Sequence, residues 1–347
     1  MSHTLESAIF GHAFAWGGPA TAGRLRSCPE DFQVTELPLA EPSGEGEHAW
    51  LWIRKRTENT GTVARRLARC AGVPLRQVSY AGLKDRHAVT EQWFSVHLPG
   101  QPDPDWSVIN SETLTLVRQT RHQRKLRRGA LTGNAFRIRM RAVDGDQAGL
   151  EDRLKQVAAH GVPNYFGEQR FGRDASNLRT ANRLFAGTAG KLTRQQRGLA
   201  LSAARSYLFN RVLAQRVSDK TWNRVIPGDA LQLSGSHSFF VADALDPELE
   251  QRVQMMDVHP TGPLAGAGDT PVTGAARQLE CGCLADQQAW CSGLAKAGLR
   301  QERRALRLAV EALAWSWLQP DCLELTFRLT AGAYATSVLR ELVRERE

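Results

Sequence analysis

An aspartate between two cationic residues is the part of this sequence best suited to covalent chemistry. Asp85 lies in the stretch YAGLKDRHAVT and is flanked by Lys84 and Arg86. A carboxyl group with a pKa of about 3.9 is ionised at neutral pH, so an aspartate can act as a nucleophile without a general base. The two cations would favour the ionised form even in a closed pocket. From these residues alone, a role for Asp85 as the cap of a helix or turn beginning at Arg86 is the favoured alternative.

A dense basic run is the strongest compositional signal in the chain. Six positively charged residues and no acidic residue lie within the eleven residues from Arg118 to Arg128. Because the run has no acidic partner of its own, the phosphate groups of a nucleic acid are suitable counter-ions, and such contacts position a partner without reading its sequence. The run predicts contact with an RNA backbone, and a solvated basic face is the alternative. The residues expected to make this contact are Arg121, Arg124, Lys125, Arg127 and Arg128.

Two segments, Asn164–Gly172 and Gly129–Phe136, combine aromatic residues with glycines. Aromatic rings next to arginine can stack on unpaired bases, and an asparagine amide offers both a donor and an acceptor to a base edge. Aromatic residues beside glycines also close a core around a tight turn. From these residues alone the structural interpretation is favoured.

The composition indicates a soluble globular protein with room for two domains. Of the 347 residues, 42% are hydrophobic and 23% are charged. The net charge of +9 and the pI near 9.6 favour a polyanionic partner. No run of 18 apolar residues occurs, so no membrane span is expected. The start Met1–Glu6 has no feature of a signal peptide, and we expect a cytoplasmic protein.

The sequence lacks the common signatures of cofactor-dependent and metal-dependent enzymes. It has no phosphate loop, serine elbow, HExxH helix or dinucleotide-binding glycine turn. The cysteine cluster Cys281, Cys283 and Cys291 lacks the paired spacing of a structural zinc site. These cysteines are therefore expected to be ordinary buried thiols, and a reaction without cofactor or metal is favoured.

The hydropathy pattern predicts a sheet that is interrupted by a more helical segment. In Ala135–Ala142, apolar residues alternate with Arg137, Arg139 and Arg141, which is typical of a strand with one dry and one cationic face. Similar alternation occurs in residues 94–98, 114–116 and 323–329 and indicates an antiparallel sheet covered by helices on one side.

Helical patterns occur both beside the predicted strands and in the middle of the chain. Thr62–Ala71 is expected to be a helix on the sheet, and Gly198–Gln215 and Gln287–Ala297 predict helices in the middle segment. Asp257–Gly268 is rich in proline and glycine and is expected to be a surface loop. Because strand-type alternation resumes at Cys322, the middle segment is interpreted as an insertion into the sheet domain.

Strings spread in order along the whole chain resemble those of the TruD family of tRNA pseudouridine synthases. The most specific string is Ala81–Trp93, which contains Asp85. The others are Pro29–Phe32, Gly44–His48, Lys125–Leu131, Gly133–Phe136, Gly161–Gly167, Leu201–Ser206 and Ala335–Val338. A chance match of so many ordered strings is not credible.

The resemblance implies an α+β fold, in which a pseudouridine-synthase-type catalytic domain with a mixed, mostly antiparallel sheet is interrupted by a TruD-specific α/β insertion domain. The expected bounds are 1–159 and 305–347 for the catalytic domain and 160–304 for the insertion. The implied reaction isomerises uridine at position 13 of tRNA by breaking the N1–C1′ bond and joining C5 to C1′. No cofactor, metal, membrane or protein partner is implied, and a monomer is expected.

The resemblance also implies roles for particular residues. Asp85 corresponds to the catalytic nucleophile, which attacks either C1′ of the ribose or C6 of the base. Arg26 lies where the family has a basic residue that can pair with the catalytic carboxylate, and Phe136 corresponds to an aromatic residue beside the flipped uracil. The positions implied to contact the substrate are Phe32, Asn134, Phe136, Tyr334 and Arg26.

Tyr334 is the clearest departure from the family pattern, which has phenylalanine at this position, and its hydroxyl would require a partner if it were buried. Two other classes of protein remain as alternatives. A non-catalytic tRNA-binding protein or RNA chaperone would use the same basic surface without needing Asp85. An RNA methyltransferase would require bound S-adenosylmethionine, for which the sequence has no convincing glycine loop.

Overall fold

The structure, a computed structural model, describes residues 12–242 and 244–346. These residues form two compact units. The sheet unit consists of Ala20–Gln147, Val310–Ala333 and the chain from Val343 onward. The helical unit consists of the described residues up to Pro19, Ala148–Ala309 and Tyr334–Leu342. Met1–Glu6, where no signal peptide is expected, lies outside the described residues.

The two units divide the chain at different points from the predicted domains. The chain passes from the sheet unit to the helical unit after Gln147 and returns to the sheet unit after Ala309. The later segment Tyr334–Leu342 again belongs to the helical unit. The predicted catalytic domain instead extends to residue 159 and resumes at residue 305. The assignment of a catalytic and an insertion domain to those bounds therefore stays a prediction.

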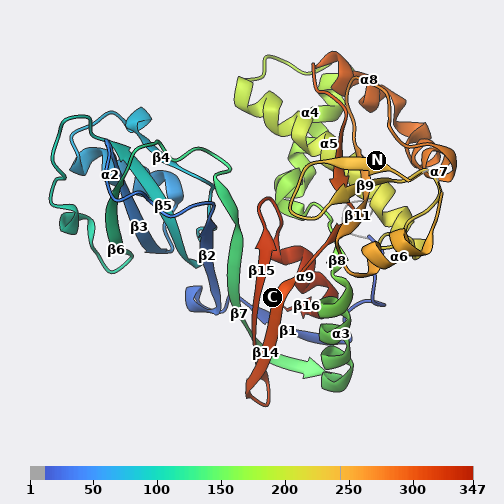
Figure 1. Cartoon of the computed structure of the whole chain (residues 1–347), viewed down its shortest axis with the longest axis horizontal. Helices are drawn as coiled ribbons and strands as arrows, with labels where there is room; N and C mark the ends of the chain where they lie inside the picture. The colour runs from blue at the N-terminus through green and yellow to red at the C-terminus, as the bar shows by residue number, and fades with distance from the viewer. Residues whose placement is uncertain (1–11, 243, 347) are drawn as a thin grey trace. The chain divides into compact units, whose positions relative to one another are not determined.

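A mixed, mostly antiparallel sheet forms the sheet unit, as the sequence predicted. Its strands are β1 (Thr21–Leu25), β2 (Phe32–Pro38), β3 (His48–Arg56), β4 (Val78–Tyr80), β5 (Val89–His97), β6 (Leu114–His122), β7 (Leu131–Gly145), β14 (Glu311–Gln319), β15 (Cys322–Thr330) and β16 (Arg344–Glu345). They follow the order β14-β15-β7-β2-β5-β3-β6, with β1 paired to β7 and β16 and β4 paired to β5 (Figure 1). Among the described pairs, β2–β5 and β1–β16 are parallel.

The helix α2 (Thr60–Cys70) covers one face of this sheet and confirms the helix predicted there. Its buried residues Val63 and Leu67 pack against Leu51, Ile53 and Phe94 of the strands. Burial of these apolar side chains is the main force that holds the helix on the sheet. The unit also contains three short 3-10 helices, η1 (Pro29–Asp31), η2 (Leu75–Gln77) and η3 (Trp106–Ile109).

The strand β7 has the dry face and the cationic face that its alternation predicted. Ile138 is fully buried on the dry face. On the other face, Arg139 pairs with Glu324 at 2.8 Å, and Arg141 binds the fully buried Asp31 at 2.7 Å. These arginines therefore stabilise the fold, because their charges are already paired within the sheet unit.

The helical unit contains two small sheets, with strand order β10-β9-β11-β12 and a β8–β13 pair. Its elements are α3 (Gln147–His160), β8 (Val162–Pro163), η4 (Glu168–Phe171), η5 (Arg173–Ala175), α4 (Ser176–Phe185), α5 (Arg194–Ser218), β9 (Ala230–Leu233), β10 (Phe239–Val241), α6 (Pro247–Gln254), β11 (Val258–Leu264), α7 (Gly274–Leu284), η6 (Ala285–Gln287), α8 (Gln288–Lys296), β12 (Glu302–Ala305), β13 (Arg307–Leu308) and α9 (Ala335–Leu342). The long helix α5 begins with a capping box formed by Thr193 and Gln196, and α5 and α8 confirm the predicted helices. None of the described helices has the length and apolar character needed to cross a membrane.

The surface loop predicted for Asp257–Gly268 is wrong, because most of the segment forms the buried strand β11. Residues 258–260 pair with β9, and residues 261–264 pair with β12. Proline lacks only the N–H donor, and the carbonyl of Pro260 still accepts a bond from the Leu306 N–H at 2.8 Å. A side chain at Gly262 would press against Phe209 and Leu306, so the glycine permits close packing.

The prediction of buried thiols is also wrong in part. Cys281 is exposed on α7, and Cys283 and Cys291 are only partly buried. The buried residues of α7, Ala276, Glu280 and Leu284, recur every four residues, and Cys281 lies about 100° around the helix from the centre of that stripe. In the described part of the chain, no three His, Cys, Asp or Glu side chains form a group that could hold a metal ion.

Replacing Asp229 with alanine is expected to lower the free energy of unfolding by about 3–5 kcal/mol, because Arg216 would stay buried without its counter-charge. Asp229 accepts two hydrogen bonds from Arg216, each 2.8 Å long, and both side chains are almost fully buried. Urea unfolding measures the change. The control is Asp286→Ala, which removes an exposed pair with Arg211 and should cost less than about 1 kcal/mol. Equal losses for the two variants would contradict the prediction.

Candidate active site

Asp85 lies in a loop between β4 and β5, and its side chain stabilises a turn. No helix begins at Arg86; instead Asp85 Oδ1 accepts a hydrogen bond from the His87 N–H at 2.9 Å. The other oxygen, Oδ2, lies 3.5 Å from Nη2 of Arg26. The Asp85 side chain keeps 34% of its surface exposed, so a substrate can reach it. Of the two interpretations of Asp85 from sequence, turn capping is therefore present, and it uses only one of the two carboxylate oxygens.

Arg26 connects Asp85 to an aromatic layer. Its guanidinium lies over the ring of Phe32, with Cζ 4.3 Å from the ring centroid. Phe32 meets Phe136 edge to face at 6.3 Å, and Phe136 stacks on Phe327 at 5.2 Å. Both Phe32 and Phe136 are buried. The structure thus joins three of the predicted site residues, Arg26, Phe32 and Phe136, in a series of contacts that begins at Asp85.

The Lys84 ammonium contacts Glu36 and Asn134 instead of the Asp85 carboxylate, so its electrostatic support of Asp85 stays a prediction. Its Nζ lies 3.0 Å from Oε2 of Glu36 and donates a 2.6 Å hydrogen bond to Oδ1 of Asn134. Only 4% of the Lys84 side chain is exposed. Burial raises the pKa of the Glu36 carboxyl, and the positive charge of Lys84 opposes that shift. The side chain that faces the Asp85 carboxylate is Arg26, which is distant in sequence.

The pairing of β2 with β7 places Glu36 and Asn134 on either side of the lysine. Glu36 lies directly opposite Asn134 in the antiparallel register. Residues opposite each other in a ladder point to the same face of the sheet, so both side chains reach Lys84. Asn134, the fourth predicted site residue, is therefore joined to the residue before Asp85.

Three buried polar side chains form hydrogen bonds with the backbone of the loop that carries Asp85. Gln92 donates from Nε2 to the Gly82 carbonyl at 2.9 Å, and the Thr60 hydroxyl accepts from the Lys84 N–H at 3.1 Å. Lys55 donates from Nζ to the Asp85 carbonyl at 2.8 Å. Thr60, Gln92 and Lys55 are all at most 2% exposed. Loop carbonyls and amides that would otherwise bind water are thus fixed by the sheet and by α2.

Glu36 and Lys55 are parts of the site that the sequence analysis missed. Each occupies a position that the alternation of its strand reserves for buried residues, because Val34 and Glu36 share a face of β2, as do Ile53 and Lys55 of β3. A charged residue in the apolar register of a strand requires a buried partner. A charged residue at a position reserved for buried residues was therefore the sequence signal that could have identified Glu36 and Lys55.

The basic run is partly paired, contrary to the expectation that it has no acidic partner nearby. Arg118 pairs with Glu41 at 3.2 Å, and Arg121 pairs with Asp103 at 3.1 Å. Both partners come from distant parts of the sequence, which a search within the run could not find. Among the described residues, no carboxylate pairs with the predicted contact residues Arg124, Lys125, Arg127 and Arg128, and all four are exposed.

The basic loop, residues 123–130 between β6 and β7, is held by hydrogen bonds of its backbone although its charged side chains are exposed. The Trp50 indole donates to the Arg124 carbonyl at 3.1 Å, and the Leu126 N–H donates to the Ser95 hydroxyl at 3.0 Å. The Gly129 N–H donates to the Ala81 carbonyl at 2.8 Å, which connects the loop directly to the one that carries Asp85.

A basic groove of about 620 Å³ lies between this loop and α2. It is lined by Gly61, Ala64, Arg65, Leu75, Val78, Ser79, Tyr80, Lys125, Leu126, Arg127 and Arg128, with no carboxylate among them. Four cations around a partly apolar floor can hold a phosphodiester strand and leave room for a base.

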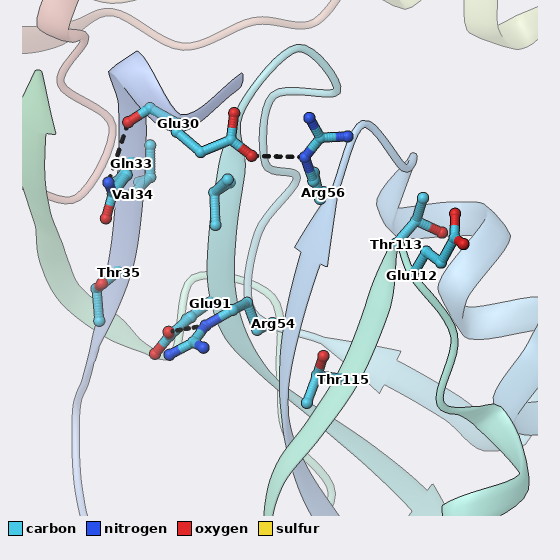
Figure 2. A pocket seen from close by; sticks show the side chains of 11 residues that line it. Glu30, Gln33, Val34, Thr35, Arg54, Arg56, Glu91, Glu112, Thr113 and Thr115 are labelled. Carbon is cyan, nitrogen blue, oxygen red and sulfur yellow. Dashed lines mark hydrogen bonds and ion pairs between the residues drawn. The ribbon is translucent and has the colours of Figure 1, made fainter. Parts of the chain in front are cut away.

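A different hollow, of about 400 Å³, opens on the opposite face of the sheet, and Figure 2 shows its lining. Its lining includes Gln33, Val34 and Thr35 of β2, of which Gln33 and Thr35 share one face of the strand. The arginines of this hollow are already paired, Arg54 with Glu91 at 2.7 Å and Arg56 with Glu30 at 2.6 Å (Figure 2). It therefore offers no free cation for an anionic substrate, and none of the predicted site residues line it.

Tyr334, the remaining predicted site residue, belongs to the helical unit. Its hydroxyl accepts a 2.8 Å hydrogen bond from Nη2 of Arg170, so the partner that a buried tyrosine would require is present. In the segment Asn164–Gly172, Tyr165 and Phe166 are buried in the core of this unit. The structural interpretation of those aromatic residues is therefore confirmed.

The fold of the chain is that of a pseudouridine synthase. A crystal structure from Methanosarcina mazei whose protein bears the name TruD matches it with a TM-score of 0.74 over 97% of each chain, at 20% sequence identity. The family model described as tRNA pseudouridine synthase D (TruD) matches residues 11–184 and 175–342. This chain belongs to the TruD family.

Curated relatives cover nearly the full length of the chain. It is 53% identical over 329 residues to the tRNA pseudouridine synthase D of Methylococcus capsulatus, covering 95% of this chain and 93% of that protein. It is 52% identical over 338 residues to the tRNA pseudouridine synthase D of Nitrosococcus oceani, covering 96% and 94%.

The buried Lys55 predicts a specific pH dependence of stability. Burial lowers the pKa of Lys55 from 10.5 to about 8, although the charges of Asp85 and Glu58 oppose the shift. Between these two pKa values the unfolded chain holds a proton that the folded chain has released, so this group makes stability rise with pH. Relative to Lys55→Met, the wild-type protein should therefore gain stability between pH 8 and about 10. Urea unfolding of both proteins across this range tests the prediction, and parallel curves would contradict it.

Proposed function

We propose that this chain isomerises uridine at position 13 of tRNA to pseudouridine and that Asp85 is the nucleophile. The observation that carries the proposal is the Asp85 carboxylate, one-third exposed and 3.5 Å from Arg26, in a loop that buried side chains hold in place. Membership of the TruD family supports the same reaction, and the relatives that match over the full length bear the name of this activity. The position in the tRNA comes from the family resemblance.

The reaction requires the target uridine to leave its stack, because a carboxylate cannot reach the sugar or the base edge inside a duplex. Asp85 then adds to C1′ of the ribose or to C6 of the base. The N1–C1′ bond breaks, the uracil turns within the site, and C5 bonds to C1′. The bond to Asp85 then breaks, at C1′ because C5 displaces the carboxylate or at C6 by elimination as the C5 proton leaves. In both routes the proton at C5 is released and the Asp85 carboxylate is restored. The Arg26 guanidinium lies beside the Asp85 carboxylate, and the rings of Phe32 and Phe136 provide an apolar wall for the uracil.

In this proposal the basic loop holds the tRNA backbone while the chemistry takes place. Arg124, Lys125, Arg127 and Arg128 are exposed, and the loop is bonded to the one that carries Asp85. Phosphate contacts there would position the target nucleotide and offset the cost of unstacking. We further propose that Tyr334 contacts the substrate and that the protein acts as a cytoplasmic monomer.

Asp85→Asn is expected to abolish turnover while leaving tRNA affinity within about tenfold of wild type, because the task of the carboxylate is covalent rather than adhesive. Release of tritium from tRNA labelled at uracil C5 measures turnover, since bond formation at C5 expels that hydrogen. Asp152→Asn, an exposed change on α3, is the control and should keep the wild-type rate. Wild-type rates in the Asp85 variant would remove Asp85 from the mechanism, and no release by the wild-type protein would favour a non-catalytic RNA-binding protein.

Neutralising the exposed basic loop should weaken tRNA binding in a salt-dependent way. The triple variant Arg124→Gln, Lys125→Gln, Arg127→Gln is expected to reduce the slope of log Kd against log salt by about 2 to 3, because each lost phosphate contact removes about 0.7–0.9. Filter binding at several salt concentrations measures the slope.

The matched control for the loop variant is Arg118→Gln, Arg121→Gln. These arginines lie in the same run but are paired with Glu41 and Asp103, so a smaller change in slope is expected. Equal changes in slope for the two variants would contradict the prediction, because the arginines in ion pairs would then bind RNA as strongly as the unpaired cations.

A further inference from the structure

The Lys84 ammonium controls which atoms of Asn134 remain available to a substrate. A lysine ammonium carries only donors, so the amide atom in contact with it must be the acceptor Oδ1. The contact is short, at 2.6 Å, and the lysine side chain is almost completely buried. The orientation of the Asn134 amide therefore follows from the chemistry of its neighbour.

The ammonium itself cannot turn away from Asn134 without a large cost. Glu36 lies 3.0 Å from Nζ, is 1% exposed, and accepts a further hydrogen bond from the Trp93 N–H at 3.3 Å. Moving Lys84 out would leave a buried carboxylate without its counter-charge, which strongly destabilises a protein. The amide of Asn134 is therefore held in one orientation by an ion pair that does not itself face the substrate.

With Oδ1 occupied, the Nδ2 hydrogens of Asn134 remain unused. Among the described residues, no protein acceptor takes them. Asn134 is partly exposed and lies two residues before Phe136 on the same face of β7, while Lys84 is the neighbour of Asp85 in the chain. Asn134 thus offers free donors at the edge of the candidate active site, while its acceptor Oδ1 is turned toward Lys84.

We propose that Lys84 is a positioning residue that fixes Asn134 as a donor to a carbonyl oxygen of the target uracil. The proposal rests on the proposed function. Uracil carries two such acceptors, O2 and O4, and either can be the partner. A donor at this position favours a base that presents a carbonyl, and a contact at O4 would reject cytosine, whose C4 bears an amino group.

A pair of substitutions at Asn134 separates this role from a purely structural one. Asn134→Asp keeps an oxygen for Lys84 but turns the substrate-facing group into an acceptor, whereas Asn134→Ala only removes the donor. We expect kcat/KM for tRNA conversion to fall about tenfold further in Asn134→Asp than in Asn134→Ala, although thermal unfolding should show the aspartate variant to be at least as stable. A structural role alone predicts the opposite order of activity, and that order would overturn the proposal.

Sulfur substitution in the substrate tests the contact itself. Transcripts of the tRNA carry uridine, 2-thiouridine or 4-thiouridine at the target position, and sulfur is a weaker hydrogen-bond acceptor than oxygen. For the wild-type protein, one of the two thio substitutions should lower kcat/KM about fivefold, the value of one ordinary hydrogen bond, and the position that does so identifies the partner oxygen as O2 or O4.

The penalty for sulfur should disappear in Asn134→Ala and shrink in Lys84→Met, where the amide is free to turn. Lys155→Met, on the exposed surface of α3, is the matched control and should keep the full penalty. If the Lys84 variant fails to fold, the two Asn134 variants still decide the outcome. Equal penalties in the wild-type protein and Asn134→Ala, or none in the wild-type protein, would overturn the proposal. Failure of the wild-type protein to convert unmodified tRNA would instead overturn the proposed function, and this inference with it.

Discussion

The ion pair between Lys84 and Glu36 is almost completely removed from water, and the geometry around Asp85 depends on it. A buried pair recovers its desolvation cost only when its geometry is good and its remaining donors and acceptors are satisfied. Here Lys84 donates to the Asn134 amide oxygen and Glu36 Oε1 accepts from the Trp93 N–H, while Glu36 Oε2 has the ion pair with Lys84 but no hydrogen bond. Because losing either charge would cost about 3–5 kcal/mol, Lys84 has one stable position. Because Asp85 follows Lys84 directly in the chain, the fixed position of Lys84 also limits where the Asp85 backbone can lie.

The sheet register is what brings the partners of Lys84 together. Glu36 of β2 stands opposite Asn134 of β7. A slip of one residue would send one of the two side chains to the opposite face, so the hydrophobic pattern that fixes the register also fixes the site. The apolar neighbours Val34 and Phe136 are paired in the same ladder and bury the same face. The same strand pairing therefore forms both the hydrophobic core and the surroundings of Lys84 in this part of the chain.

The sequence predicted the features that depend on local periodicity and left out those that depend on contacts between distant segments. The strand β7 and the helix α2 follow directly from alternating or helical spacing of apolar residues. The strand β11 was missed because its prolines and glycine resemble a loop, and only pairing with β9 and β12 makes it a strand. Within the candidate site, Asp85 was identified from its string, but the ion-pair partners of Lys84 and Arg121 come from 48 and 18 residues away, and the residues around Lys84 and Arg121 do not point to them.

The distribution of paired and unpaired cations explains how a chain with a net charge of +9 can direct a polyanion to one place. Arg139 and Arg141 on β7 are neutralised by carboxylates of the sheet unit, and so is Arg121 in the basic run. Paired charges attract a distant phosphate weakly, because each cation is offset by an anion a few ångströms away. The cations of the loop around Arg124 have no carboxylate partner among the described residues and therefore attract a phosphate more strongly than these paired arginines. That loop is hydrogen-bonded to the one that carries Asp85. The same ion pairs that stabilise the sheet thus leave the cations without a partner in the loop bonded to that of the candidate nucleophile.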